Sequence, residues 1–186
     1  SGLSDEIEGL LSETLNNGGK VIIPAFSVGR TQLLVYTLHQ LVDAGRLPDF
    51  PIFVDSPLSV NATEVFRLHP ECFNRDIYTF LREKENPFGM DNLTYIRKAS
   101  ESIKLNTLEG PAIIISSSGM CEAGRIRHHL KNNISDPNDL ILFVGYCAYN
   151  TLGAVIRAGI DPVYIFGEPH EVKARVASFD GFSGHA

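Results

Sequence analysis

Four short segments of the chain are continuously apolar up to their last residue and rich in β-branched side chains: residues 21–26, 52–55, 112–116 and 140–144. A strand with one solvated face alternates apolar and polar residues, whereas a strand covered on both faces is apolar throughout. The four runs therefore predict strands of a parallel sheet with helices on both faces.

Helical patterns separate these runs. Each run is followed by a turn and then by apolar residues at helical spacing, in segments 31–44, 59–68, 122–132 and 152–158. Another helix is predicted over residues 3–15, where apolar residues form one stripe and Asn17-Gly18-Gly19 supplies the helix end. Residues 71–108 interrupt the repeat. For this segment we expect helical pieces and a loop packed over one side of the sheet. The repeat predicts an α/β fold with an open, mostly parallel sheet.

The pattern changes after Pro162. Residues 163–166 are apolar, residues 167–170 have the composition of a turn, and residues 171–179 place apolar and charged side chains on opposite faces. This alternation predicts a C-terminal antiparallel hairpin, with one solvated face, at the edge of the sheet.

Composition limits the class of protein. With 186 residues, of which 44% are apolar, the chain fits one globular domain. A net charge of −6 argues against an autonomous nucleic-acid binder, because such proteins neutralise phosphates with Lys and Arg, so any nucleic-acid contact would be local. No apolar run reaches the ~20 residues of a membrane span and the start lacks a signal-peptide pattern, so we expect no membrane association and a cytoplasmic location. The three widely spaced cysteines are interpreted as small buried apolar residues.

Polar loops follow the predicted strands at the edge where ligands of parallel α/β sheets bind. Asp55 ends the second run and Ser56 follows it, and Ser116 ends the third run and is followed by Ser117-Ser118-Gly119. Hydroxyls and backbone N–H groups at helix N-termini favour an anion, and phosphate is the natural candidate. The alternative is that these residues only cap helices, although a cap needs one hydroxyl rather than three in succession.

Arg30 and the histidines are the remaining candidates for chemistry. Arg30 opens a predicted helix, where a cation is unfavourable for the helix dipole, so either a structural ion pair with Asp55 or a bound phosphate is expected to compensate it. On a later helix, His129 flanks the apolar stripe and is interpreted as a packed, hydrogen-bonded residue, whereas His128 faces solvent. His185 alone lies in a Gly/Ser loop after a strand, a context suited to proton transfer or metal chemistry.

Five motifs stand in an order that points to one family. They are VIIPAFSVGRTQ at residues 21–32, IFVDSP at 52–57, SSGM at 117–120 with GRIRHHL at 124–130, FVGY at 143–146 with TLG at 151–153, and GFSGH at 181–185. Together they resemble the β-CASP region of metallo-β-lactamase-type RNA-processing nucleases, in particular bacterial enzymes similar to the endonuclease subunit of the cleavage and polyadenylation specificity factor. The resemblance covers essentially the whole chain and identifies residues 1–186 as a β-CASP domain.

The resemblance implies a larger enzyme. In that family the β-CASP domain is inserted into a metallo-β-lactamase fold, caps a site with two zinc ions and leaves a cleft for single-stranded RNA. The histidine that matches His185 is a catalytic-site residue there. By analogy, the groups expected to hold RNA phosphates are Arg30, Asp55-Ser56, Ser116-Ser117-Ser118-Gly119 and Ser183.

The family's zinc-binding HxHxDH motif does not occur in this chain. The chain also ends in the loop of His185, where a catalytic loop is expected to continue. We therefore expect a fragment of a metallo-β-lactamase-fold nuclease that holds no metal itself, with two zinc ions bound outside it.

Three functions remain open. The expected one is a substrate-clamping domain of a zinc-dependent ribonuclease that hydrolyses RNA phosphodiester bonds, with the fragment inactive by itself and the parent a candidate homodimer. The second is a catalytically silent homologue that binds RNA or protein partners. The third, a free-standing phosphate- or nucleotide-binding module, is disfavoured because a complete domain is not expected to end in a half-formed loop.

Overall fold

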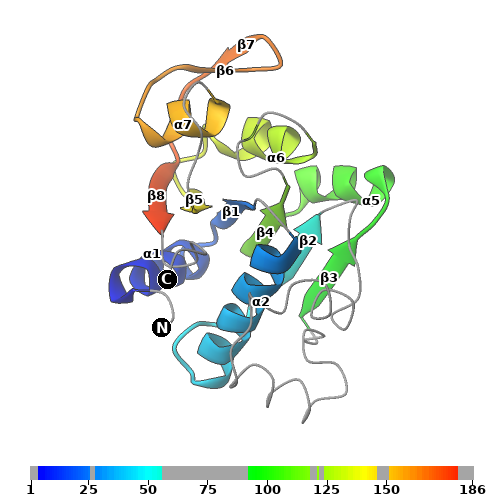
Figure 1. Cartoon of the computed structure of the whole chain (residues 1–186), viewed down its shortest axis with the longest axis vertical. Coiled ribbons are helices and arrows are strands. Elements are labelled where there is room, and N and C mark those ends of the chain that lie inside the picture. Colours follow the sequence, from blue (N-terminus) through cyan, green and yellow to red (C-terminus); the bar gives the residue numbers. More distant parts are fainter. Residues whose placement is uncertain are drawn as a thin grey trace.

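The computed structural model describes residues 4–25, 28–55, 92–117, 121, 124–145 and 151–179. Within them, one sheet (Figure 1) contains β1 (Lys20–Pro24), β2 (Ile52–Asp55), β3 (Leu93–Ile96), β4 (Ala112–Ser116), β5 (Leu140–Val144) and β8 (Arg175–Phe179). The order is β3-β2-β4-β1-β5-β8, and every adjacent pair runs parallel. The four apolar runs form the four inner strands, which confirms the predicted parallel sheet.

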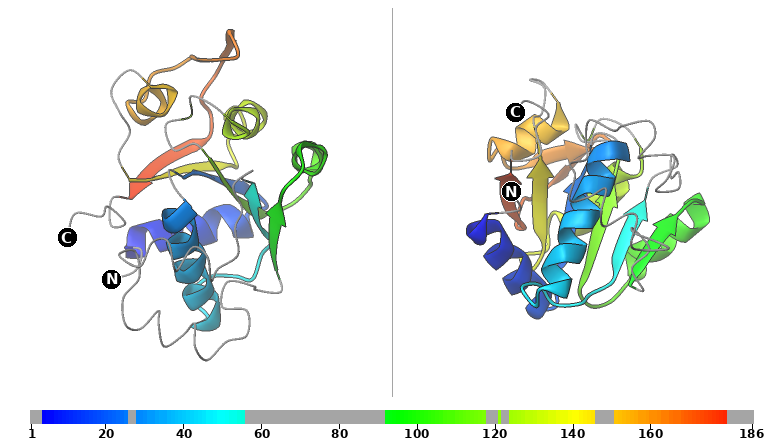
Figure 2. Two further views of the ribbon diagram at one scale, coloured as in Figure 1. Left: turned by 45° about the vertical axis from the view of Figure 1, so that its right-hand side comes forward. Right: turned by 60° about the horizontal axis from the view of Figure 1, so that its bottom comes forward.

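Helices cover both faces of this sheet, as the left view of Figure 2 shows. The helices on one face are α1 (Asp5–Asn16) and α2 (Val28–Asp43). Those on the other face are α5 (Ala99–Lys104), the short 3-10 turn η2 (Leu105–Thr107), α6 (Ile126–Asn133) and α7 (Leu152–Arg157). None of the helices in the described ranges has the length and apolar content that crossing a bilayer requires. The α/β fold with helices on both faces is confirmed.

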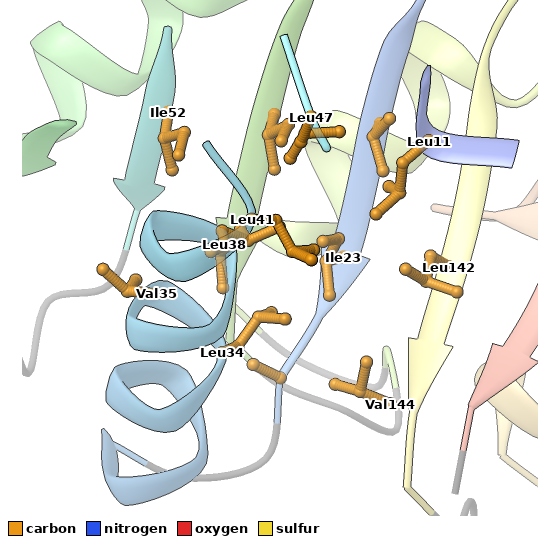
Figure 3. Packing of buried hydrophobic residues seen from close by; sticks show 14 of the residues in the cluster. Leu11, Ile23, Leu34, Val35, Leu38, Leu41, Leu47, Ile52, Leu142 and Val144 are labelled. Atoms are coloured by element: carbon orange, nitrogen blue, oxygen red, sulfur yellow. The ribbon is translucent and has the colours of Figure 1, made fainter. Parts of the chain in front are cut away.

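Strand side chains alternate between two buried layers. Ile23 of β1 and Leu142 of β5 point toward the first layer, where they pack with Leu11 of α1 and Leu38 of α2 (Figure 3). Ile22, one residue along, belongs to the second layer together with the apolar side chains of α6 and α7. Each inner strand contributes to both layers, which explains why its sequence is apolar except at the strand ends.

The predicted antiparallel hairpin is present, but it is shorter than the sequence pattern indicates. It consists of β6 (Val163–Ile165) and β7 (Glu168–His170), with a two-residue turn between them, and it is separate from the main sheet. The prediction placed the turn at residues 167–170 and the second strand at 171–179. That part of the prediction is wrong, because residues 168–170 themselves pair with β6.

β8 joins the edge of the main sheet and runs parallel to β5, whereas the sequence pattern predicts an antiparallel edge strand. The backbone N–H groups of Lys173 and Ala174 donate to the Ile134 carbonyl at 3.0 and 2.9 Å. The next N–H, of Arg175, donates to the Asp139 carbonyl at 3.0 Å, beside the start of β5. The chain thus returns to the amino end of β5 before β8 begins, which fixes the parallel direction.

β3 is the other edge strand, and the sequence pattern does not predict it. The pattern gives only helical pieces and a loop for residues 71–108, of which α5 confirms a helical piece. β3 lacks an unbroken apolar run because it is only partly covered, with Thr94 exposed and its neighbours half-buried. The expected helix of residues 59–68 lies outside the described residues.

Candidate functional site

The carboxyl ends of β1, β2 and β4 lie level with one another. Pro24 and Asp55 both pair in register with Ser116. The Ser116 hydroxyl donates to the backbone carbonyl of Asp55 at 2.9 Å, and the Ala25 N–H donates to the Ser116 carbonyl at 2.9 Å. We expect the loop of residues 116–119 to lie beside both Arg30 and Asp55; the structure places its first residue, the buried Ser116, beside Asp55, and the half-buried Ser117 follows it.

Asp55 lies at the centre of a buried polar cluster. Strand alternation places its side chain on the face covered by α5 and α6, and it has no exposed surface. Arg125 Nη1 donates to Oδ1 at 2.6 Å, and His129 Nε2 lies 2.6 Å from Oδ2. The Ser102 hydroxyl also donates to Oδ2. We call these four residues, Asp55, Ser102, Arg125 and His129, the Asp55 cluster.

The Asp55 cluster favours an ionised carboxylate. Burial by itself raises the pKa of Asp55, but hydrogen bonds from His129, Ser102 and Arg125 outweigh it and hold the pKa below its usual value. An ionised carboxylate only accepts hydrogen bonds, so the short contact assigns a proton to Nε2 of His129. The buried charge of Asp55 is thereby matched by a guanidinium and two further donors.

Arg125 connects the cluster to the neighbouring edge strand. Its second nitrogen, Nη2, donates to the backbone carbonyl of Arg97, directly after β3, at 3.0 Å. Arg125 stands at the N-cap of α6, where a cation is unfavourable for the helix dipole, and the Asp55 carboxylate compensates that cost. The cluster therefore ties β2, β3, α5 and the start of α6 into one unit at the carboxyl edge of the sheet.

The structure bears on several sequence-based interpretations of this region. His129 is packed and hydrogen-bonded, as predicted, and His128 is exposed, as predicted. The proposed ion pair between Asp55 and Arg30 is not the one that forms: Asp55 pairs with Arg125. Arg30 is half-buried in the first turn of α2, which covers the opposite face of the sheet.

Sequence reasoning missed Arg125 and Ser102 as members of the site. A signal for Arg125 is present in its spacing, because residues 125 and 129 are one helical turn apart and share a face. Nothing local marks Ser102, which reaches Asp55 only because β2 and β3 are neighbours in the sheet.

Several predicted site residues lie outside the described part of the chain: Ser56, Ser118, Gly119, Ser183 and His185. Of the described ones, Asp55 and Ser116 have side chains that are buried and engaged in internal hydrogen bonds. These hydrogen bonds hold the ends of β2 and β4 in place. Arg30 and Ser117 retain partial exposure at or next to the same edge.

The described residues do not fit a metal ion. They contain no group of three His, Cys, Asp or Glu side chains with the spacing that a metal needs. Asp55 and His129 provide two such groups, but the Arg125 guanidinium occupies Oδ1 at 2.6 Å and would repel a cation.

Comparison with known proteins agrees with this architecture. A ribonuclease, TTHA0252 of Thermus thermophilus, is 38% identical over 177 residues, which cover 95% of this chain and 41% of that protein. An RNase J-like protein of Methanocaldococcus jannaschii is 35% identical over 175 residues, 94% of this chain and 39% of that protein. Transcription termination factor FttA of Pyrococcus abyssi is 34% identical over 183 residues, 95% of this chain and 28% of that protein.

The chain thus spans less than half the length of each of these relatives. The model of the Beta-Casp domain family matches residues 31–156, a segment that includes β2, β4, β5 and every member of the Asp55 cluster. Since this match covers more than half of the chain and the fold agrees with it, the protein belongs to the Beta-Casp domain family.

Proposed function

We propose that residues 1–186 form the substrate-clamping domain of a larger, zinc-dependent ribonuclease of the metallo-β-lactamase type that cleaves RNA phosphodiester bonds in the cytoplasm. The observation that carries the proposal is the Asp55 cluster, which braces the carboxyl edge of the sheet in a domain whose relatives include named ribonucleases. A rigid sheet edge of this kind is suited to holding a flexible RNA strand in one position. The zinc ions would be bound outside this chain.

The roles within this proposal follow from exposure. Arg30 and Ser117 are partly exposed, so they are assigned to RNA phosphates, as are Ser56, Ser118, Gly119 and Ser183 by their places in the matched motifs. Asp55 and Ser116 are buried and are assigned to positioning the backbone of the same edge. His185 is assigned to the reaction centre between this domain and the lactamase part.

A catalytically silent homologue that binds RNA or protein partners is the competing proposal. One relative carries the name of a transcription termination factor rather than of a ribonuclease. The two proposals differ in whether the full-length protein turns over RNA. Whether the full-length protein forms the expected homodimer is a separate question, which light scattering of the same preparation answers.

The test compares the full-length protein with its His185→Ala variant in an RNA cleavage assay, with and without a metal chelator. We expect metal-dependent cleavage by the unmodified protein and a loss of turnover in the variant, while the thermal unfolding midpoint stays nearly unchanged. His39→Gln, in the second half of α2, is the matched histidine control and is expected to retain turnover. Cleavage that survives His185→Ala contradicts its assignment, and absence of cleavage with RNA binding intact favours the silent homologue.

The 186-residue chain by itself is expected to cleave no RNA and to bind no stoichiometric zinc. Metal analysis of the purified chain, beside the full-length protein, checks this. Zinc-dependent cleavage by the chain alone would overturn the inserted-domain proposal.

A further inference from the structure

The turn between β6 and β7 contains Phe166, a residue type that is unfavourable for the backbone conformation of this turn. Figure 1 shows the hairpin extending away from the sheet, beyond α6 and α7. Its two turn residues, Phe166 and Gly167, both have positive φ, +52° and +78°. Two-residue hairpin turns of this kind strongly prefer Asn-Gly, because a bulky side chain is strained at positive φ. The phenylalanine is 43% exposed, so burial in a core does not explain its presence.

The Phe166 ring contacts two basic side chains from the first turn of α6. The Arg127 guanidinium carbon lies 4.6 Å from the ring centroid, and the His128 ring centroid lies 4.8 Å away at an interplanar angle of 38°. A cation in the first turn of a helix is unfavourable for the helix dipole. Among the described residues Arg127 forms no ion pair, and its Nε is buried without a hydrogen-bond partner. Two locally unfavourable features therefore meet in one contact, which we call the hairpin-tip cluster (Phe166, Arg127 and His128).

The hairpin-tip cluster lies next to the proposed RNA-binding edge. α6 begins directly after the β4 loop, with the Ile126 N–H donating to the Ser117 carbonyl at 3.3 Å. Arg125, one residue earlier, belongs to the Asp55 cluster and contacts the Arg97 carbonyl. Arg97 and the following lysine are both exposed. Basic residues thus stand both next to the Arg97 contact of Arg125 and next to Phe166, in a chain whose net charge is −6.

We propose that the hairpin-tip cluster is a stacking platform for an unpaired base of the RNA strand, with Arg127 contacting the adjacent phosphate. Exposed aromatic rings beside cations bind single-stranded nucleic acid in this way, and the stacking tolerates any base. The strained turn holds the Phe166 ring at the hairpin tip before RNA binds, so the side chain needs little ordering on binding. The inference rests on the proposed function and extends the RNA path from the carboxyl edge across α6 to the hairpin.

The test uses fluorescence anisotropy of an unstructured oligouridine strand, long enough to span both regions, with the full-length protein. Phe166→Asn supplies the Asn-Gly turn that the backbone prefers, so the thermal unfolding midpoint should be unchanged or higher. The same variant is expected to bind the strand about tenfold more weakly through the lost stacking contact. Arg127→Gln is expected to weaken binding and to lower the salt-dependence slope by about one. Tyr164→Asn, at an exposed aromatic of the same hairpin, is the matched control and should leave the affinity unchanged.

A gain in stability together with a loss of affinity is the signature of a functional aromatic, because a purely structural Phe166 would lose stability without affecting RNA. Equal affinity of Phe166→Asn and the unmodified protein overturns the inference while leaving the proposed function intact. An equal loss in Tyr164→Asn also overturns it. A concentration-dependent self-association that Phe166→Asn abolishes, with RNA binding unchanged, would assign the tip to a second copy of the chain instead. If the unmodified protein binds no RNA, both proposals fail.

Discussion

Replacing Asp55 by Asn is expected to destabilise the fold by about 3 kcal/mol, because it removes the charge around which the Asp55 cluster is built. The carboxylate accepts hydrogen bonds from Arg125 and His129 at 2.6 Å each, and from Ser102. Hydrogen bonds to charged groups contribute about 1.5–3 kcal/mol each, and an amide of the same shape retains only part of them. The Arg125 side chain is 17% exposed, so water can solvate it in part, which places the estimate at the lower end of the range for a broken buried pair.

Urea unfolding at neutral pH measures this change. We expect the midpoint to fall without a change in the slope m, and the thermal midpoint to fall by roughly 6–12 °C for a chain of this size. The exposed pair of Glu13 and Arg175 offers a matched control, since its atoms are also 2.6 Å apart but both side chains are 50% exposed. Glu13→Gln is expected to be nearly neutral, because exposed pairs are solvated with or without their partner.

The dependence on pH provides a second readout. The pKa of Asp55 is lower in the folded state than in the unfolded chain, so the unfolded chain binds more protons between these two values. The unmodified protein should therefore lose this stabilisation as the pH falls through that acidic range, and Asp55→Asn should not. A cost below about 1 kcal/mol, the level of a surface pair, would refute the reasoning, as would an unchanged acid dependence.

Three further predictions concern other parts of the chain. Burial raises the pKa of Asp139 to about 6, so the free energy of unfolding should fall as the pH rises from ~4 to ~6. Asp139→Asn should remove that fall and add about 2 kcal/mol to the free energy of unfolding at neutral pH. A pH profile of urea unfolding that the substitution leaves unchanged contradicts this. Gly19→Ala would place a Cβ 1.9 Å from the Asn138 carbonyl oxygen and should cost about 3 kcal/mol by the same measurement, whereas Gly9→Ala, with nothing within 4 Å, should be neutral or stabilising. Arg30→Ala in the full-length protein should weaken RNA binding and lower its salt slope by about one, and an unchanged slope would favour a structural role.

The inner part of the sheet is predictable from sequence because burial on both faces leaves an unambiguous pattern. The edge strands are not, since partial exposure mixes polar residues such as Thr94 and Arg175 into their sequences. The alternation in residues 175–179 is compatible with either strand direction. Its direction depends on the hydrogen bond from Arg175 to Asp139, a contact that no local pattern encodes.

The site shows a similar division between local and long-range information. His129 is recognisable as a packed residue because its position on the helix, next to the apolar stripe, is a local property. The partner of Asp55 cannot be recognised in this way. Arg125 lies 70 residues further along the chain, and it contacts Asp55 only because β2 and β4 are neighbours in the sheet. A partner that depends on strand order becomes predictable only when the topology is known.

The direction of β8 sets a limit on where His185 can go. Phe179 pairs with Val144 at the carboxyl end of the sheet, and His185 follows six residues later. Six residues reach at most about 20 Å, while the end of β4, three strands away, lies only about 15 Å from the end of β8. If β8 ran antiparallel to β5, its last residue would lie at the amino end of the sheet, roughly 16 Å further from the end of β4. The backbone direction of one edge strand, without any side chain, thus places Phe179, the last described residue, at the same edge of the sheet that the Asp55 cluster braces.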